Sequence, residues 1–322
     1  MTGRSPESGH DVCAGSRSDS TEGTHADHSH RAGLEAANAS SRTVRLPLGM
    51  TRYAVLADVH GNLPALQSVF AAVEGERVDA IVCAGDLVGY GAMPNECVAE
   101  LARRDAIAVA GNHDLMAIDV LSTERTSRAA ALAIRWTRQA LDDASRSFLR
   151  ALPVRASPHD LLVAHGSLDD TSEYVRLPEQ ASEQLRRMGS AAAEARVLVL
   201  GHTHHPMIVS ERRGLLAQRA PARVRFDRDE RVLVNPGSVG QSRDRWPRAR
   251  FAIVDTALDE VVLHSLRYDV ARARRALRAH DLPPRGVHAP PHANSPFAVA
   301  LVRASPEPLR RAYRAARRTV VR

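Results

Sequence analysis

The sequence predicts an α/β fold in which a largely central β-sheet is flanked by helices. Short runs of Val, Ile, Leu and Ala recur along the middle of the chain, and most end in Gly, Asp, Asn or His. They span residues 53–58, 80–86, 106–112, 160–166, 196–202, 231–237 and 250–255. Such unalternating apolar runs are typical of strands buried on both faces. Helical patterns separate the early runs, and this alternation of strand and helix indicates the α/β class.

The elements between and after these runs can also be placed. Helices are expected at 63–75, 94–103, 124–150 and 179–194. Asn62 either lines a pocket or caps the first helix, and we favour the cap because Pro64 stands at an early helical position. Residues 260–269 are expected to pair with the run at 250–255 as a hairpin, which adds antiparallel structure near the end.

The two ends of the chain differ in composition from its middle. Residues 1–49 are rich in Ser, Gly, His, Asp and Thr, and we interpret them as a disordered leader. Met50 directly precedes the first expected strand, so a start of translation there is kept open. We expect one domain over residues 50–280, followed by a Pro-rich linker and a basic tail over 281–322.

The charge of the chain is concentrated in that tail. The net charge is +7, all 44 basic residues are Arg, and residues 271–322 hold twelve Arg against two acids. A basic tail can bind nucleic acid or stay solvated, and we favour the solvated state. The chain has neither a membrane-spanning apolar run nor a secretory signal, and its three cysteines lack metal or disulfide spacing. We therefore expect a cytoplasmic protein without a membrane partner, and the oligomeric state stays open.

Polar side chains collect where the expected strands end. They are Asp58 and His60, Asp86, Asn112 and His113, His165, and His202 and His204. Each motif alone is compatible with a turn or a helix cap. Together they would bury many unpaired polar groups, each at a cost in free energy. Because ligands bind outside the carboxyl ends of strands in such sheets, we expect these side chains to converge. Imidazole and carboxylate suit first-row divalent metals, and so many ligands suit two ions that share a carboxylate.

The order of these motifs resembles a known family. D-x-H, G-D, G-N-H-D, H and G-H-x-H follow one another as in the calcineurin-like metallophosphoesterase superfamily, within residues 53–269. GDLVGYG (85–91) and NPGSVGQ (235–241) are similar to its small bacterial and archaeal phosphodiesterase branch. The resemblance implies a central β-sandwich of mixed parallel and antiparallel strands with helices outside, in αββα order. Gly89-Tyr90-Gly91 and Asp114 replace residues typical of the protein serine/threonine phosphatases, so that activity is not implied.

The resemblance also implies a dinuclear hydrolase for phosphoric ester bonds. One divalent ion would be held by Asp58, His60, Asp86 and His204, and a second by Asp86, Asn112, His165 and His202. The ions could be Mn, Fe, Zn, Ni or Co. A water that bridges them would attack a small phosphate ester, most readily a phosphodiester. His113 would protonate the leaving group, and Asp114 would fix its tautomer and raise its pKa.

Some roles and functions stay open at this level. Tyr90 either stacks on a substrate base or packs inside the domain. Arg243 and Arg245 either contact a phosphate or face solvent, and we favour solvent. A non-catalytic interaction scaffold on the same fold and a nuclease-like enzyme that uses the basic tail are the alternative functions. The complete motif set favours the small-molecule phosphoesterase.

Overall fold

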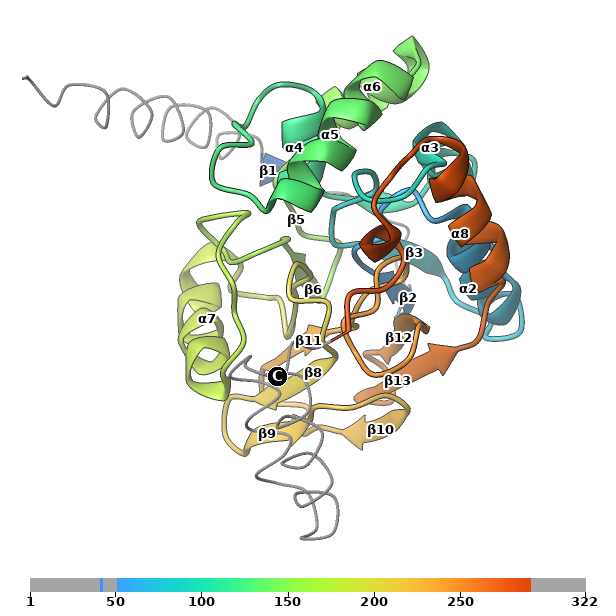
Figure 1. Cartoon of the computed structure of the whole chain (residues 1–322). Coiled ribbons are helices and arrows are strands. Elements are labelled where there is room, and N and C mark those ends of the chain that lie inside the picture. Colours follow the sequence, from blue (N-terminus) through green and yellow to red (C-terminus); the bar gives the residue numbers. More distant parts are fainter. Residues whose placement is uncertain (1–40, 43–50, 291–322) are drawn as a thin grey trace, which may run out of the picture.

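The structure is a computed structural model that describes residues 41–42 and 51–290. Two β-sheets pack face to face between layers of helices (Figure 1). The predicted αββα sandwich of mixed parallel and antiparallel strands is therefore confirmed. Apart from Ser41–Arg42, the expected leader lies outside the described residues, and so does the basic tail beyond residue 290.

The first sheet contains six strands in the order β10-β13-β12-β2-β3-β4. Its parallel part consists of β2 (Arg52–Leu56), β3 (Ala80–Cys83) and β4 (Ile107–Ala108). Its antiparallel part consists of β12 (Ala249–Asp255), β13 (Glu260–Leu266) and β10 (Ala222–Arg225). The hairpin expected near the end of the chain is β12 with β13.

The second sheet contains seven strands in the order β1-β5-β6-β7-β11-β8-β9. The strands are β1 (Ser41–Arg42), β5 (Arg155–Ala156), β6 (Leu161–Val163), β7 (Val197–Val199), β11 (Val232–Asn235), β8 (Met207–Ser210) and β9 (Gly214–Ala217). β6, β7 and β11 run parallel, whereas β8 is antiparallel to both of its neighbours. The sequence patterns did not indicate β8, β9 or β10.

The central strands of each sheet bury both of their faces, which explains why their sequence patterns do not alternate. In β2, Tyr53 and Val55 point into the core between the sheets, while Ala54 and Leu56 point to the helices outside. Successive side chains of a strand face opposite sides, so a strand in the middle of four layers must be apolar throughout.

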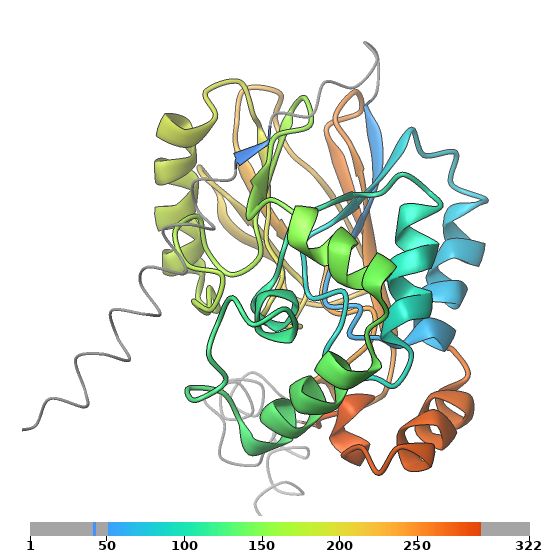
Figure 2. The same cartoon turned by 90° about the horizontal axis from the view of Figure 1, so that it is seen from above.

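The helices cover the two outer faces of the sandwich. They are α2 (Leu63–Val73), α3 (Pro94–Ala102), α4 (Asn112–Ala117), α5 (Arg128–Ala140), α6 (Asp143–Ala151), α7 (Pro178–Ala191), α8 (Val270–Ala279) and a 3-10 helix at Pro284–Gly286. Figure 2 shows α7, in yellow-green, on one side of the two sheets, with α2 and α3, in blue and teal, on the other. None of the helices in the described part of the chain is long and apolar enough to cross a membrane.

Two segments differ from expectation for identifiable reasons. The single helix expected over 124–150 is split into α5 and α6, because Leu141 is extended and the Asp142 side chain caps α6 by accepting from Ser145 N–H at 2.7 Å. Residues 281–290, expected as the start of a linker, pack on the domain instead. Leu282 and Val287 are buried there.

The central strand β12 offers a test of the core between sheet and helices. Phe251 is fully buried, and its ring stacks on His264 with centroids 4.5 Å apart. Phe251→Ala should lower the free energy of unfolding by about 3–5 kcal/mol, because it leaves a cavity in a close-packed core. Urea denaturation measures the change. Leu258→Ala, at a side chain that is 58% exposed, is the control and should have little effect; equal losses would contradict this packing.

Candidate metal centre

The candidate ligands converge at one end of the sandwich. Asp58 and His60 follow β2, and Asp86 follows β3, so these three come from the first sheet. His165 follows β6, and His202 and His204 follow β7, in the second sheet. Asn112 and His113 begin α4 after β4. All eight side chains are buried, with exposed fractions between 0 and 7%.

The backbone turns sharply at the ligands themselves. Positive φ angles occur at Asp58 (55°), His60 (51°), Asp86 (55°), His202 (63°) and His204 (63°). Side chains rarely adopt this left-handed region, although Asp and His tolerate it better than most. Backbone strain concentrated in one cluster points to function. Hydrogen bonds between the loops stabilise this strained backbone. Asp58 N–H donates to Gly85 O at 3.0 Å, and His60 N–H donates to Asp86 O at 2.9 Å.

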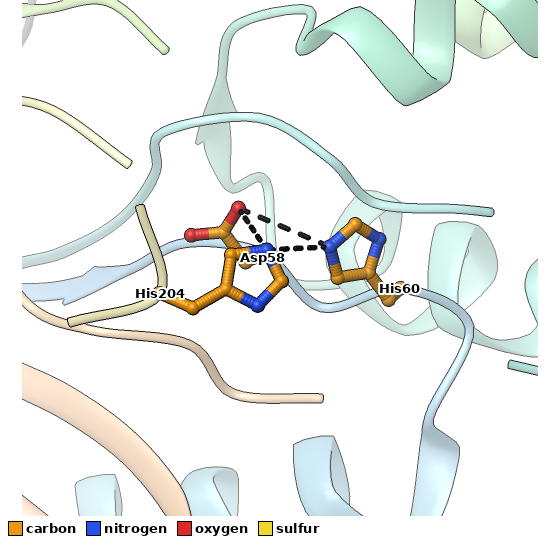
Figure 3. A group of neighbouring side chains, drawn as sticks. All are labelled: Asp58, His60 and His204. Atoms are coloured by element: carbon orange, nitrogen blue, oxygen red, sulfur yellow. Dashed lines mark hydrogen bonds and ion pairs between the residues drawn. The ribbon is translucent and has the colours of Figure 1, made fainter. Parts of the chain in front are cut away.

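The first group consists of Asp58, His60 and His204, whose polar atoms face one another (Figure 3). The Nε2 atoms of the two imidazoles are 3.1 Å apart, and His204 Nε2 lies 3.3 Å from Asp58 Oδ1. His60 Nδ1 contacts Val88 O and His204 Nδ1 contacts Gln241 O, so a neutral ring keeps its proton on Nδ1. The lone pairs on the Nε2 atoms of the two rings then face each other, and this contact is favourable only beside a cation.

The second group consists of Asp86, His165 and His202, with Asn112 beside them. His165 Nε2 lies 3.3 Å from Asp86 Oδ2 and 3.2 Å from Asn112 Oδ1, while its Nδ1 contacts Ala84 O at 2.6 Å. His202 is turned the other way. Its Nε2 contacts Ser172 O at 3.0 Å, and its buried Nδ1 has no hydrogen-bond partner. Each ring thus has one nitrogen that no backbone carbonyl contacts.

Asp86 links the two groups. Its Oδ2 lies 3.6 Å from His60 Nε2 and 3.3 Å from His165 Nε2, without a well-formed hydrogen bond. Its Oδ1 accepts from His113 N–H at 2.8 Å. Asp58 Oδ2 is likewise buried and unpartnered. Buried polar atoms nearly always have partners, so these orphaned oxygens and the free imidazole nitrogens fit divalent cations.

Burial favours the uncharged forms of most of these ligands, whereas a metal would need neutral imidazoles and an ionised Asp58. Burial raises the pKa of Asp58 to about 7 and lowers the pKa of His60, His202 and His204 well below the usual value. These imidazoles are therefore neutral, which is the form that binds metal. His165 differs, because Asp86 and Asp58 overcome the effect of burial and raise its pKa to about 10. A cation at His165 would displace its proton.

The structure corrects the expected role of Asp114. Its Oδ1 accepts from Val88 N–H at 3.1 Å and its Oδ2 accepts from Gly111 N–H at 2.9 Å, so the carboxylate holds the start of α4. It does not raise the pKa of His113, which burial lowers to about 4. The His113 ring instead packs against Tyr90 and His60, with centroids 4.6 and 4.8 Å apart.

Of the two other candidate residues, one has a structural role and one borders the metal centre. Asn62 caps α2 through Ala65 N–H, and its amide donates to Gly240 O and Tyr268 Oη, so we no longer propose a substrate contact for it. Tyr90 is 9% exposed and lies edge-on to His60, where it both packs and borders the centre.

Two residues beside the centre were not assigned to it from the sequence. Arg243, for which solvent was favoured over a phosphate contact, is only half-exposed and acts electrostatically on both groups, whereas Arg245 is exposed as expected. Its position just after the NPGSVGQ segment was the available signal. The ring of Tyr174 lies 4.0 Å from that of His202, and no motif marks it.

Comparison with known proteins gives a consistent result. A family model described as a calcineurin-like phosphoesterase superfamily domain matches residues 51–259. An uncharacterized protein of Methanocaldococcus jannaschii is 30% identical over 234 residues, which cover 71% of this chain and 93% of the relative. The crystal structure of a metallophosphoesterase from Sphaerobacter thermophilus is 32% identical, with a TM-score of 0.64 over 74% of this chain and 97% of that one. A hypothetical protein from Pyrococcus horikoshii, 21% identical with a TM-score of 0.60 over 74% of this chain and 96% of that one, shares the fold.

Gly89 gives a test of how the His113 ring is held. Gly89 has a φ of 127°, and a Cβ there would collide with His113 Nδ1, whereas Gly214 has a φ of 69° with no atom within 4 Å of its Cβ position. Both Gly→Ala changes meet backbone strain, but only Gly89→Ala also overpacks its surroundings. It should therefore cost about 1–3 kcal/mol more in free energy of unfolding than Gly214→Ala, as measured by urea denaturation. Equal costs would show that the His113 ring is not confined there.

Proposed function

Because this chain belongs to the calcineurin-like phosphoesterase superfamily, we propose that it is a metal-dependent phosphodiesterase with two divalent cations. The proposal rests above all on Asp86. Its unpartnered Oδ2 lies within 3.6 Å of one imidazole nitrogen from each ligand group. A carboxylate oxygen in that position can serve two ions, as dinuclear phosphoesterase sites require.

The ligands divide as their positions suggest. One ion would be held by Asp58, His60, Asp86 and His204, and the other by Asp86, Asn112, His165 and His202. The neutral amide of Asn112 supplies oxygen without adding negative charge, so the centre stays cationic enough to attract phosphate. Two bound divalent cations, such as manganese, would lower the pKa of water and neutralise charge on the phosphoryl oxygens.

His113 is the proposed proton donor to the leaving oxygen. Its ring lies beside His60 and is close to Asp86, yet its Nδ1 forms no hydrogen bond within the described structure. Donation of a proton requires the imidazolium form of His113, and the negative charge of a bound phosphodiester favours that form. Packing against Tyr90 and Gly89 orients the ring, in place of the carboxylate of Asp114.

The aromatic borders of the centre support a diester substrate. Tyr90 lies beside His60 and His113, and Tyr174 lies beside His202. A phosphodiester carries two organic groups, and each can pack against one ring. No contact among residues 51–290 favours the scaffold or the nuclease-like alternative, and a cytoplasmic location stays a prediction.

The first test is metal-dependent hydrolysis of bis-p-nitrophenyl phosphate. Chelation should abolish the activity, and Mn²⁺ should restore it. Asp86→Asn should lower kcat/KM more than about 100-fold and reduce bound manganese, because losing a shared ligand exceeds the usual cost of losing a supporting residue. Asp229→Asn, at a surface carboxylate, is the matched control. Activity that survives both chelation and Asp86→Asn would refute the proposal.

The second test isolates the proton donor. His113→Gln should retain bound manganese but lower kcat about 10²- to 10⁴-fold for esters with poor leaving groups. The loss should shrink as the leaving phenol becomes more acidic, because a stable phenolate needs no proton. Kinetics on a series of aryl phosphodiesters measures this dependence. An equal loss across the series would argue that His113 does not protonate the leaving oxygen.

A further inference from the structure

Arg243 brings a positive charge close to the metal centre. It is half-buried and lies in the loop between β11 and β12. Its guanidinium acts electrostatically on Asp58, His60 and His204 of the first group and on His202 of the second. Tyr90 and His113 feel the same charge. Contacts link Arg243 to the first group, because its Nε donates to Gln241, whose backbone O atom contacts His204 Nδ1 at 2.7 Å.

The charge of Arg243 is not neutralised by an ion pair within residues 51–290. Its Nε donates to Gln241 Oε1 at 3.4 Å, and the side chain of Tyr174 lies beside the guanidinium. Both partners are neutral. The adjacent carboxylate of Asp244 pairs with Arg250 at 2.6 Å instead. A half-buried guanidinium without a carboxylate partner can bind an anion that a ligand supplies.

Tyr174 fixes the guanidinium relative to the second ligand group. Its ring lies 4.0 Å from the ring of His202, and the guanidinium of Arg176 covers it at 3.8 Å. Gln241 is held in turn, because its amide donates to Arg285 O at 2.9 Å. Arg243 is thus preorganised by two neutral partners.

We propose that Arg243 binds the non-bridging phosphoryl oxygens of the substrate and that Tyr174 positions it for this contact. The inference rests on the proposed phosphodiesterase function and names the residue that would recognise the phosphoryl group beside the metals. A guanidinium suits this task, since its planar fork matches two oxygens of a phosphate.

The test measures binding of inorganic phosphate to the manganese-loaded full-length protein by titration calorimetry, with KM and kcat for bis-p-nitrophenyl phosphate alongside. Arg243→Gln should weaken phosphate binding about 10- to 100-fold, as expected for loss of a charge-assisted hydrogen bond. Arg243→Lys should restore part of the affinity because it keeps the charge and loses the fork. Arg245→Gln, on the exposed neighbour in the same loop, is the control and should bind phosphate as the wild type does.

Tyr174→Phe should weaken phosphate binding by a smaller factor, and it should add nothing in the Arg243→Gln background, because it acts through Arg243. Unchanged phosphate affinity in Arg243→Gln would overturn the proposal. A loss of affinity that merely follows loss of manganese would overturn it too, since Arg243 would then support the metals. If the wild type binds phosphate but hydrolyses no ester, the proposed function fails while the comparison of phosphate affinities still decides the role of Arg243.

Discussion

Two buried carboxylates without enough hydrogen-bond donors set the conditions for the rest of the structure. Asp58 and Asp86 are at most 1% exposed, and the Oδ2 atom of each has no partner in the described part of the chain. Leaving such atoms unpaired in a dry interior costs free energy that packing alone would not justify. Around them, imidazoles direct their free nitrogens inward, because backbone carbonyls occupy the opposite ring nitrogens of His60, His165 and His204. The arrangement fits the binding of divalent cations.

The fold produces this arrangement because the two sheets meet at one end of the sandwich. Parallel strands in each sheet bring their carboxyl ends to the same edge, so ligands from distant parts of the sequence become neighbours. The chain reverses direction directly after these strands, and the positive φ angles of the ligand residues make this turn possible. Close approach of the loops follows. Gly85 has a φ of 82°, and a Cβ there would lie 2.7 Å from Gly111 N, so the contact between these two ligand loops requires glycine.

The sequence was sufficient for most of the central strands and for the cluster of polar side chains at their ends, because their signals are local. An apolar run that ends directly at Asp58 or His165 indicates both a strand and a candidate ligand at the end of that strand. The break between α5 and α6 was also local, since Asp142 is a strong cap, yet the helical pattern on both sides concealed it. Arg243 and Tyr174 could not be placed, because only tertiary contacts bring these loop residues to the centre. The role of Asp114 was misjudged for a related reason: its sequence neighbour is His113, but its hydrogen-bond donors are the N–H groups of Gly111 and Val88.

The central claim is that Asp86 is shared by two cations. Anomalous diffraction from manganese-soaked crystals tests it most directly. The account predicts two manganese peaks per chain, both in contact with the Asp86 carboxylate, one beside His60 and His204 and the other beside His165 and His202. A single peak, or manganese bound away from Asp86, would contradict it.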